Sequence, residues 1–311
     1  MTTRRDSITA HTLLLAVVAV WGATFVLVKD ALADSSPLLF NQIRMSLAFF
    51  VLACIHWRIW RSLTRSALVA GGVAGLFLAV GYEFQTAGLA RTTPSKSAFL
   101  TGLVVVFVPL LSVFPKLRPV GASGPRWSAM VGAVLAFLGI LRLTLPSGTP
   151  WRELGAAINV GDLLSLACAL GFALHLLTLG RMAREVPTGQ LATLQIGFCA
   201  LIMTLATPAF EKSYLHVTPR LLVAVGVCAV FATAAAFSVQ TWAQMHLKPT
   251  HTALLLSLEP AFAWMMSLLL RREAFSLRSA EGAGLIFAGI LVTELLTFPV
   301  AMEAEANQSQ A

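Results

Sequence analysis

Charged residues are scarce in this chain of 311 residues. Asp, Glu, Lys and Arg make up only 12% of it, whereas a soluble domain carries about 25%. Hydrophobic residues make up 57%, so the polar side chains are too few to cover a globular surface. The composition therefore excludes a cytosolic enzyme, a nucleic-acid-binding module and a disordered protein. It indicates a membrane protein with several spans.

The sequence also lacks the motifs that carry metal, nucleotide or covalent chemistry. It has no GxxxxGK[ST] loop, no HExxH motif, and no GxSxG or SxxK nucleophile. Four cysteines lie inside apolar runs without CxxC spacing: Cys54, Cys168, Cys199 and Cys228. The net charge is +8, but the Lys and Arg residues are spread along short connectors. We therefore expect no cofactor, no metal, no enzymatic activity and no nucleic-acid partner.

Long apolar segments fill most of the chain. A helix needs about 20 apolar residues to cross a bilayer, and the alternating pattern of a membrane barrel is absent. The sequence predicts an all-α membrane protein with ten transmembrane helices. Their expected bounds are 11–33, 37–57, 67–90, 94–115, 126–144, 159–182, 188–210, 220–243, 249–270 and 279–300.

The two halves of the chain resemble each other at a spacing of 150 residues. The matching pairs include Pro37 with Pro187, Gly132 with Gly282, and Gly139 with Gly289. Each half holds five spans, and an odd number turns the second copy upside down in the membrane. We expect two inverted five-helix repeats, at 11–144 and 159–300, joined by a linker at 145–158 and followed by a cytoplasmic tail at 301–311.

Over the whole chain the basic residues show no bias, with eleven on the inner side and ten on the outer side, but their distribution over the first segments predicts the orientation. With the N-terminus in the cytoplasm, the first three inner segments carry Arg4, Arg5, Arg58, Arg61, Arg65, Lys116, Arg118 and Arg126. The first two outer segments carry only Lys29, Arg91 and Lys96. Because the first helices usually dominate orientation, we expect both termini in the cytoplasm of an inner (plasma) membrane. Cleavage after Ala31-Leu32-Ala33 as a signal peptide is the less favoured alternative.

Several short motifs resemble those of a known family. They are Trp21-Gly22-Ala23-Thr24-Phe25, Thr92-Thr93-Pro94-Ser95-Lys96-Ser97-Ala98, Val108-Pro109-Leu110 and Leu258-Glu259-Pro260. Their order across residues 11–300 resembles the EamA-type branch of the drug/metabolite transporter superfamily. The resemblance implies an inner-membrane carrier of amino acids or other metabolites. One departure is Arg272-Glu273, where the family often has Gly-Glu.

A carboxylate in the ninth span is the first candidate for binding or coupling. Glu259 lies ten residues beyond Pro249, which places it about 15 Å into a hydrocarbon core roughly 30 Å thick. Charged groups at such depth face a cavity or a partner because exposure to lipid costs about 3 kcal/mol. Glu259 is expected to bind a substrate amine or a proton. The structural alternative is a protonated carboxyl that bonds to a neighbouring helix.

Two further charges are expected to meet near the outer edge. Arg44 lies about 10 Å inside the second span, and Glu83 lies about 12 Å inside the third. The matching depths predict an Arg44–Glu83 ion pair that gates the outer mouth or binds a zwitterion. A static pair, or an Arg44 side chain that reaches the headgroups, is the alternative.

Other polar and aromatic residues inside the spans are expected to line a central cavity. They are Trp21, Tyr82, Gln85, His175, Phe237 and Gln240. Tyr82 and Gln85 share one helix face, as do Phe237 and Gln240. Ordinary packing or interhelical hydrogen bonding is the competing interpretation for each.

These observations favour a secondary transporter, or permease, that works by alternating access. We expect a small metabolite, an amino acid or a related amphiphilic compound, as the substrate and export as the direction. Protons are the candidate coupling ion, the lipid bilayer is the surrounding partner, and the chain is expected to be a monomer or a weak homodimer. The alternatives are a multidrug efflux carrier, a membrane-embedded enzyme and a non-transporting scaffold.

Overall fold

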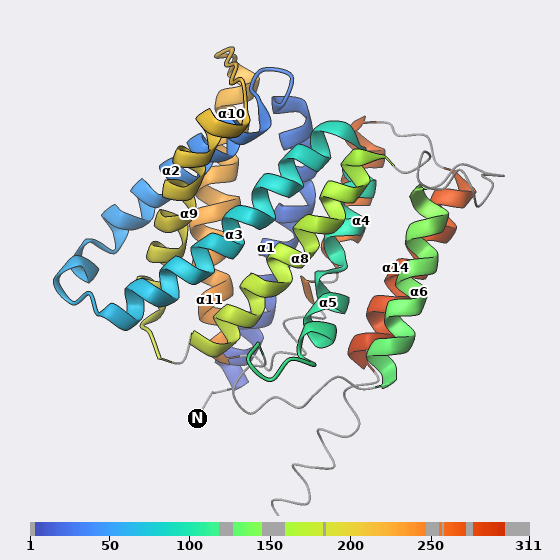
Figure 1. Ribbon diagram of the computed structural model, residues 1–311, viewed down its shortest axis with the longest axis horizontal. Helices are drawn as coiled ribbons and strands as arrows, with labels where there is room; N and C mark the ends of the chain where they lie inside the picture. Colours follow the sequence, from blue (N-terminus) through green and yellow to red (C-terminus); the bar gives the residue numbers. More distant parts are fainter. Residues whose placement is uncertain are drawn as a thin grey trace, which may run out of the picture.

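The described residues form a bundle of tilted helices (Figure 1). The computed structural model describes residues 4–117, 127–144, 159–182, 185–246, 255–256, 258–271 and 276–295. Within these residues the secondary structure is helical, and the only β feature is an isolated bridge between Ser35 and Leu215. The predicted linker at 145–158 and the tail at 301–311 lie outside the described residues.

The described residues of the first half form six α-helices. They are α1 (Arg4–Ala31), α2 (Pro37–Ile55), α3 (Arg65–Arg91), α4 (Pro94–Gly102), α5 (Val104–Leu111) and α6 (Trp127–Thr144). A short 3-10 turn, Trp57–Arg61, follows α2. The span predicted at 94–115 is therefore interrupted at Leu103, where α4 ends and α5 begins.

The described residues of the second half form six more α-helices. They are α8 (Val160–Met182), α9 (Thr188–Phe210), α10 (Pro219–Ala229), α11 (Ala236–His246), α13 (Glu259–Met266) and α14 (Leu277–Leu295). A π-helical turn, Val230–Ala235, joins α10 to α11, and a second one, Ser267–Arg271, follows α13. The sequence did not predict either π-turn.

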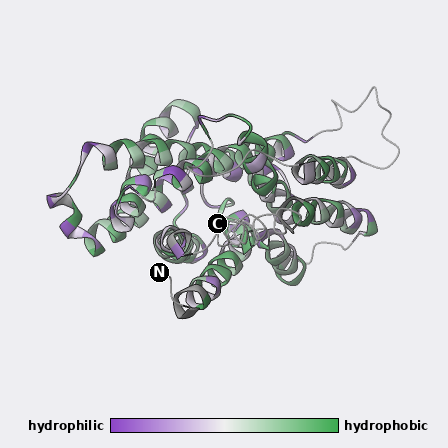
Figure 2. Cartoon of the chain, turned by 90° about the horizontal axis from the view of Figure 1, so that it is seen from below, coloured by the Kyte–Doolittle hydropathy of each residue, from purple (hydrophilic) through white to green (hydrophobic). Residues whose placement is uncertain are grey.

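Seven helices in the described part of the chain are long and apolar enough to cross a membrane. They occupy 8–31, 37–55, 65–91, 94–111, 160–182, 188–210 and 219–243. Two shorter apolar helices occupy 130–140 and 259–270. The apolar residues that dominate the helices in Figure 2 continue to the outer faces, where Phe50, Phe137 and Leu205 are each more than half exposed. Such faces suit contact with lipid rather than water.

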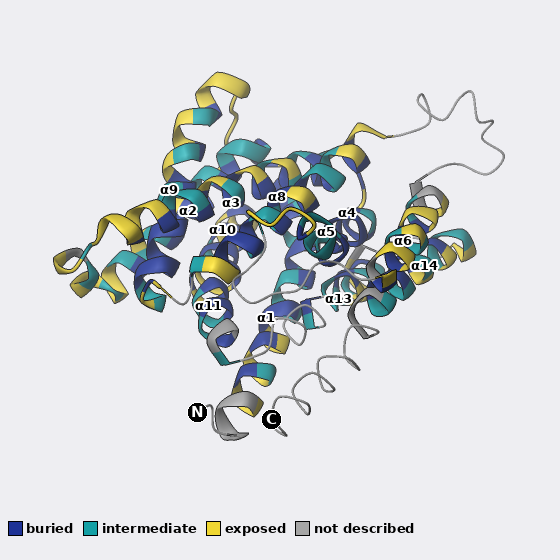
Figure 3. Cartoon of the chain, turned by 60° about the horizontal axis from the view of Figure 1, so that its bottom comes forward, coloured by how far each residue is buried: buried dark blue, intermediate teal, exposed yellow. Residues whose placement is uncertain are grey.

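Buried residues follow the inner faces of the helices (Figure 3). Since lipid gives no hydrophobic drive for helix association, close contact depends on small residues. The α6–α14 pair illustrates this point. A Cβ atom at Gly139 would lie 2.7 Å from the Gly282 carbonyl oxygen, and one at Gly289 would lie 2.5 Å from the Gly132 carbonyl oxygen. Two glycines, one from each helix, thus let the opposite backbone approach.

Loops at the far end of α1 from the N-terminus are tied together by polar contacts. Asp34, in the α1–α2 loop, pairs with Arg220 at 2.8 Å and accepts a hydrogen bond from Thr218 at 2.7 Å. Glu211 accepts hydrogen bonds from the backbone N–H groups of Leu38 and Leu39 at the start of α2. We call this set of contacts between residues 34–39 and 211–220 the loop clamp.

Candidate functional site

A cavity lies between the helices near the middle of the bundle. About 80 Å³ of it is open to the centre of a water-sized sphere, and one water needs about 10–15 Å³ in that measure. The cavity therefore has room for several waters or a small solute. Helices α1, α2, α3, α4, α5, α8, α11 and α13 all contribute lining residues.

The structure brings eight of the nine candidate residues to this cavity. They are Trp21, Arg44, Tyr82, Gln85, His175, Phe237, Gln240 and Glu259. Glu83, the ninth, is not among the lining residues. Thr24, Thr86 and Thr101 add hydroxyl groups to the wall that the sequence had not singled out.

Arg44 reaches the cavity with its side chain almost fully buried. The side chain of Thr233 accepts a hydrogen bond from Nε at 2.8 Å, and the Tyr82 hydroxyl accepts one from Nη2 at 3.2 Å. The guanidinium carbon also lies 4.5 Å from the centre of the Tyr82 ring. Neutral acceptors and an aromatic face therefore hold this cation, and no carboxylate pairs with it among the described residues.

The prediction of an ion pair between Arg44 and Glu83 is wrong. Glu83 instead accepts a hydrogen bond from Asn41 at 3.2 Å, and its other carboxylate oxygen is buried without a partner in the described part of the chain. The depths along the helices match, but adjacent residues on a helix point about 100° apart. Tyr82 occupies the face of α3 that meets Arg44, so Glu83 is turned away from it.

Asn41 links Glu83 to the cavity wall and was missed by sequence reasoning. Its side-chain amide donates to the Tyr82 carbonyl at 3.0 Å, and its carbonyl accepts a hydrogen bond from Thr86 at 3.0 Å. Asn41 is fully buried. It lies three residues before Arg44, so a polar pair on one face of α2 was the signal that could have found it.

Glu259 begins α13 rather than lying inside a continuous helix. Pro260 follows at the first turn, where its missing N–H leaves no helical hydrogen bond unmade. The side chain is half-buried and has no hydrogen-bond or ion-pair partner in the described residues. Gly22 lets α1 approach this site, because a Cβ atom there would lie 2.9 Å from the Glu259 carbonyl oxygen.

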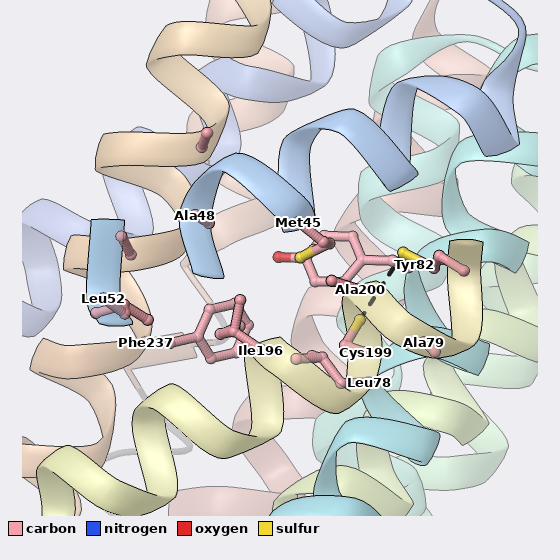
Figure 4. Close-up of a cluster of buried hydrophobic side chains, with 13 residues drawn as sticks. Met45, Ala48, Leu52, Leu78, Ala79, Tyr82, Ile196, Cys199, Ala200 and Phe237 are labelled. Atoms are coloured by element: carbon pink, nitrogen blue, oxygen red, sulfur yellow. Dashed lines mark hydrogen bonds between the residues drawn. The ribbon is translucent and has the colours of Figure 1, made fainter. Parts of the chain in front are cut away.

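Aromatic rings form much of the cavity wall. The Trp21 and Phe237 ring centroids are 5.6 Å apart, and those of Tyr82 and Phe172 are 5.2 Å apart in an edge-to-face arrangement. Figure 4 shows Tyr82 and Phe237 inside a buried cluster with neighbours such as Met45. The wall is thus shaped by rigid, mostly apolar groups that suit the hydrocarbon part of a solute.

Two amides complete the polar groups near the cavity. His175 Nε2 and Gln195 Oε1 are 2.8 Å apart, which gives the buried histidine a partner on α9. The Gln195 Nε2 atom has no partner among the described residues. Gln240 is only 2% exposed, and its Oε1 atom likewise lacks a partner there. A hydrogen-bond acceptor therefore stands unused in the wall of the cavity.

A second, wider hollow lies at the end of the bundle where α1 ends and α4 begins. It has about 620 Å³ open to the centre of a water-sized sphere, and its lining includes Lys29, Arg91 and Lys96. Lys29 donates hydrogen bonds to the carbonyls of Leu89, Ala90 and Thr92 at the end of α3. We call this hollow the vestibule.

Toward the other end, apolar side chains pack together beside the N-terminal half of α1. The cluster contains Leu14, Val18, Ala243 and Leu256, with Trp21 packed against it. Within the described residues, no three His, Cys, Asp or Glu side chains gather in a way that could hold a metal ion.

Comparisons with known proteins agree with this architecture. The family model described as the EamA-like transporter family matches residues 8–145 and again residues 159–295. An uncharacterized transporter from Archaeoglobus fulgidus is 31% identical over 288 residues, which cover 90% of this chain and 84% of that protein.

One crystal structure, of a protein described without a function, shares the fold. It has a TM-score of 0.63 and 22% sequence identity, and the match covers 93% of this chain and 98% of the other. Together with the double family match and the apolar helices, the comparisons settle the assignment: the chain belongs to the EamA-like transporter family, of the drug/metabolite transporter superfamily.

Proposed function

We propose that the protein is a secondary transporter that moves amino acids or related amphiphilic metabolites across the inner membrane. The observation that carries the proposal is a cavity that contains two opposite charges without an ion pair between them. Arg44 and Glu259 both line it, and neither has an oppositely charged partner among the described residues. Charges inside a membrane-spanning bundle are costly to leave unpaired, so the expected partners belong to a solute.

The two charges define how a zwitterion binds. Its carboxylate approaches the Arg44 guanidinium, and its ammonium group approaches the Glu259 carboxylate. The unused Gln240 carbonyl offers a further acceptor for an N–H donor, and His175 and Gln85 contribute polar surface. The apolar part of the solute lies against Trp21, Tyr82 and Phe237.

We further propose ten transmembrane helices arranged as two inverted repeats, 11–144 and 159–300. The two matches to the family model support this division. The α6–α14 contact supports it as well, because residues 150 positions apart occupy equivalent places on either side of it. In addition, α1 packs against α11 and α13, while α8 packs against α3, α4 and α5, which fits a two-fold relation between halves.

The asymmetry of the two ends supports alternating access as the mechanism. With both termini in the cytoplasm, the vestibule lies on the outer side and the apolar cluster around Leu14 closes the inner side. This arrangement corresponds to the outward-facing state. Rocking of one repeat against the other would close the vestibule and open the cytoplasmic side. Export is the proposed direction, and protons are the proposed coupling ion.

A two-stage experiment tests the proposal. A thermal-shift screen of the purified protein against amino acids and amines identifies ligands, because a ligand stabilises the state that binds it. The ligands found are then loaded into proteoliposomes, and their counterflow is measured. Saturable counterflow supports the proposal. A protein that binds none of these compounds and moves none of them contradicts it.

A further inference from the structure

In the π-turn between α10 and α11, one backbone carbonyl lacks the hydrogen bond that it would accept in an α-helix. In an α-helix the Ala236 N–H group would bond to the Ala232 carbonyl. Here it bonds to the carbonyls of Phe231 and Thr233 instead. The Ala232 oxygen therefore does not accept the hydrogen bond that Ala236 would donate in an α-helix, and π-turns of this kind are frequent at functional sites.

Side chains from two other helices donate hydrogen bonds to the Ala232 carbonyl. Trp21 Nε1 donates to the Ala232 oxygen at 2.8 Å, and Arg44 Nη2 donates to it at 3.4 Å. Both donors come from the first half of the chain, and both line the cavity. The π-turn thus joins the second half of the chain to the part of the site that carries the positive charge.

The side chain of Thr233, the next residue, also bonds to Arg44. Its hydroxyl donates to the Cys228 carbonyl at 2.8 Å, so its oxygen is left to accept the hydrogen bond from Arg44 Nε at 2.8 Å. Thr233 is fully buried and is not itself a lining residue of the cavity. It contacts the guanidinium from behind.

These contacts occupy only part of the guanidinium. Arginine has five N–H donors, and Nε and Nη2 bond to Thr233, Tyr82 and Ala232. No acceptor contacts Nη1 among the described residues, and Arg44 lines the cavity. The guanidinium is fixed through Nε and Nη2, and its Nη1 group is available to a solute.

We propose that Thr233 is a positioning residue that orients Arg44 so that its free Nη1 donors bind a carboxylate in the cavity. This inference rests on the proposed transport function and narrows the substrate class to compounds with a carboxylate. Since a hydrogen bond to a charged group is strong when buried, loss of the Thr233 oxygen should disorder the guanidinium. Binding of the carboxylate should then weaken while the rest of the site stays intact.

The test compares Thr233→Val with Thr233→Ser in proteoliposomes. Three compounds that share the side chain of leucine serve as probes. They are L-leucine itself, 3-methylbutylamine, which lacks the carboxylate, and 4-methylpentanoate, which lacks the amine. For the two carboxylates, Thr233→Val should raise KM by about tenfold or more, and Thr233→Ser should restore the wild-type value. For the amine, all three proteins should share one KM. An equal rise for all three probes would indicate a merely structural role and would overturn the inference.

A second measurement needs no substrate. The Nε–H group of Arg44, identified in an NMR spectrum by its absence in Arg44→Lys, should exchange slowly with solvent in wild type and Thr233→Ser. It should exchange faster in Thr233→Val. Slow exchange in Thr233→Val contradicts the positioning role. If the exchange behaves as expected but wild type moves none of the three probes, the positioning role stands and the proposed transport of such compounds is wrong.

Discussion

The loop clamp and the central cavity treat charge in opposite ways. In the clamp, Asp34 has an arginine and a threonine as partners, and Glu211 caps the start of α2. In the cavity, Arg44 has only neutral partners and Glu259 has none among the described residues. The clamp satisfies its charges within the chain and stabilises one arrangement of the loops. The cavity leaves charges unmatched, as a site that must bind and release a solute requires.

The largest effect is expected when the unmatched carboxylate is removed. Glu259→Gln should lower transport of an amine-bearing substrate by about a hundredfold or more, because the ammonium group loses its counter-charge. The melting temperature should stay the same or rise, since an unpaired charge inside the helical bundle is removed. Proteoliposome flux and thermal unfolding measure the two effects. Transport at the wild-type rate would show that the cavity does not use this charge.

A matched pair of glycine substitutions on α14 is expected to test the close packing of α6 against α14. Gly289→Ala places a Cβ atom 2.5 Å from the Gly132 carbonyl oxygen, whereas one at Gly284 meets nothing within 4 Å. Gly289→Ala should therefore cost about 1–3 kcal/mol of stability through overpacking. Gly284→Ala should be neutral or stabilising. Equal unfolding free energies for the two variants would contradict the close α6–α14 contact.

The clamp should show its charge pairing in the pH dependence of stability. The hydrogen bonds from Thr218 and Arg220 lower the pKa of Asp34 below its ordinary value. Its contribution to stability is therefore complete above the unfolded pKa of about 3.9 and is lost as the pH falls through the lower folded pKa. Asp34→Asn should lower the melting temperature at neutral pH and converge with wild type in acid. Parallel melting curves across this range would exclude such a contribution.

The smallest effect is expected for an exposed ion pair. Arg142 and Glu281 contact each other, but both side chains are more than 40% exposed. Pairs of this kind contribute about 0–1 kcal/mol. Glu281→Gln should leave both flux and melting temperature close to wild type, which makes it a suitable charge-removal control for Glu259→Gln. A loss of flux comparable to that of Glu259→Gln would erase the contrast between paired and unmatched charges.

Sequence reasoning anticipated part of the cavity lining because polarity inside an apolar run is informative. Trp21, His175 and Gln240 are separated widely in the chain, yet each is unusual within its own helix, and all line one cavity. The helical segments were also visible, because hydropathy and length follow from the thickness of a bilayer. Seven of these helices are long and apolar enough to span it.

The hydrogen-bond partners of the site residues were harder to predict than the positions of these residues along the helices. The rise per residue gives the depth of a side chain, but its direction around the helix depends on how neighbouring helices pack. This is why Arg44 meets Thr233 and Tyr82 rather than Glu83. The π-turn was not anticipated either, because Val230–Ala235 lies within an apolar span whose composition does not distinguish a π-turn from an α-helix.

The α6–α14 contact has a consequence for the history of the chain. Gly139 contacts the backbone at Gly282, and Gly289 contacts the backbone at Gly132, so each half carries both complementary surfaces. A polypeptide of half this length could have joined an identical neighbour through the same glycines before any gene fusion. In such an ancestor, one improved glycine would have acted at two places at once.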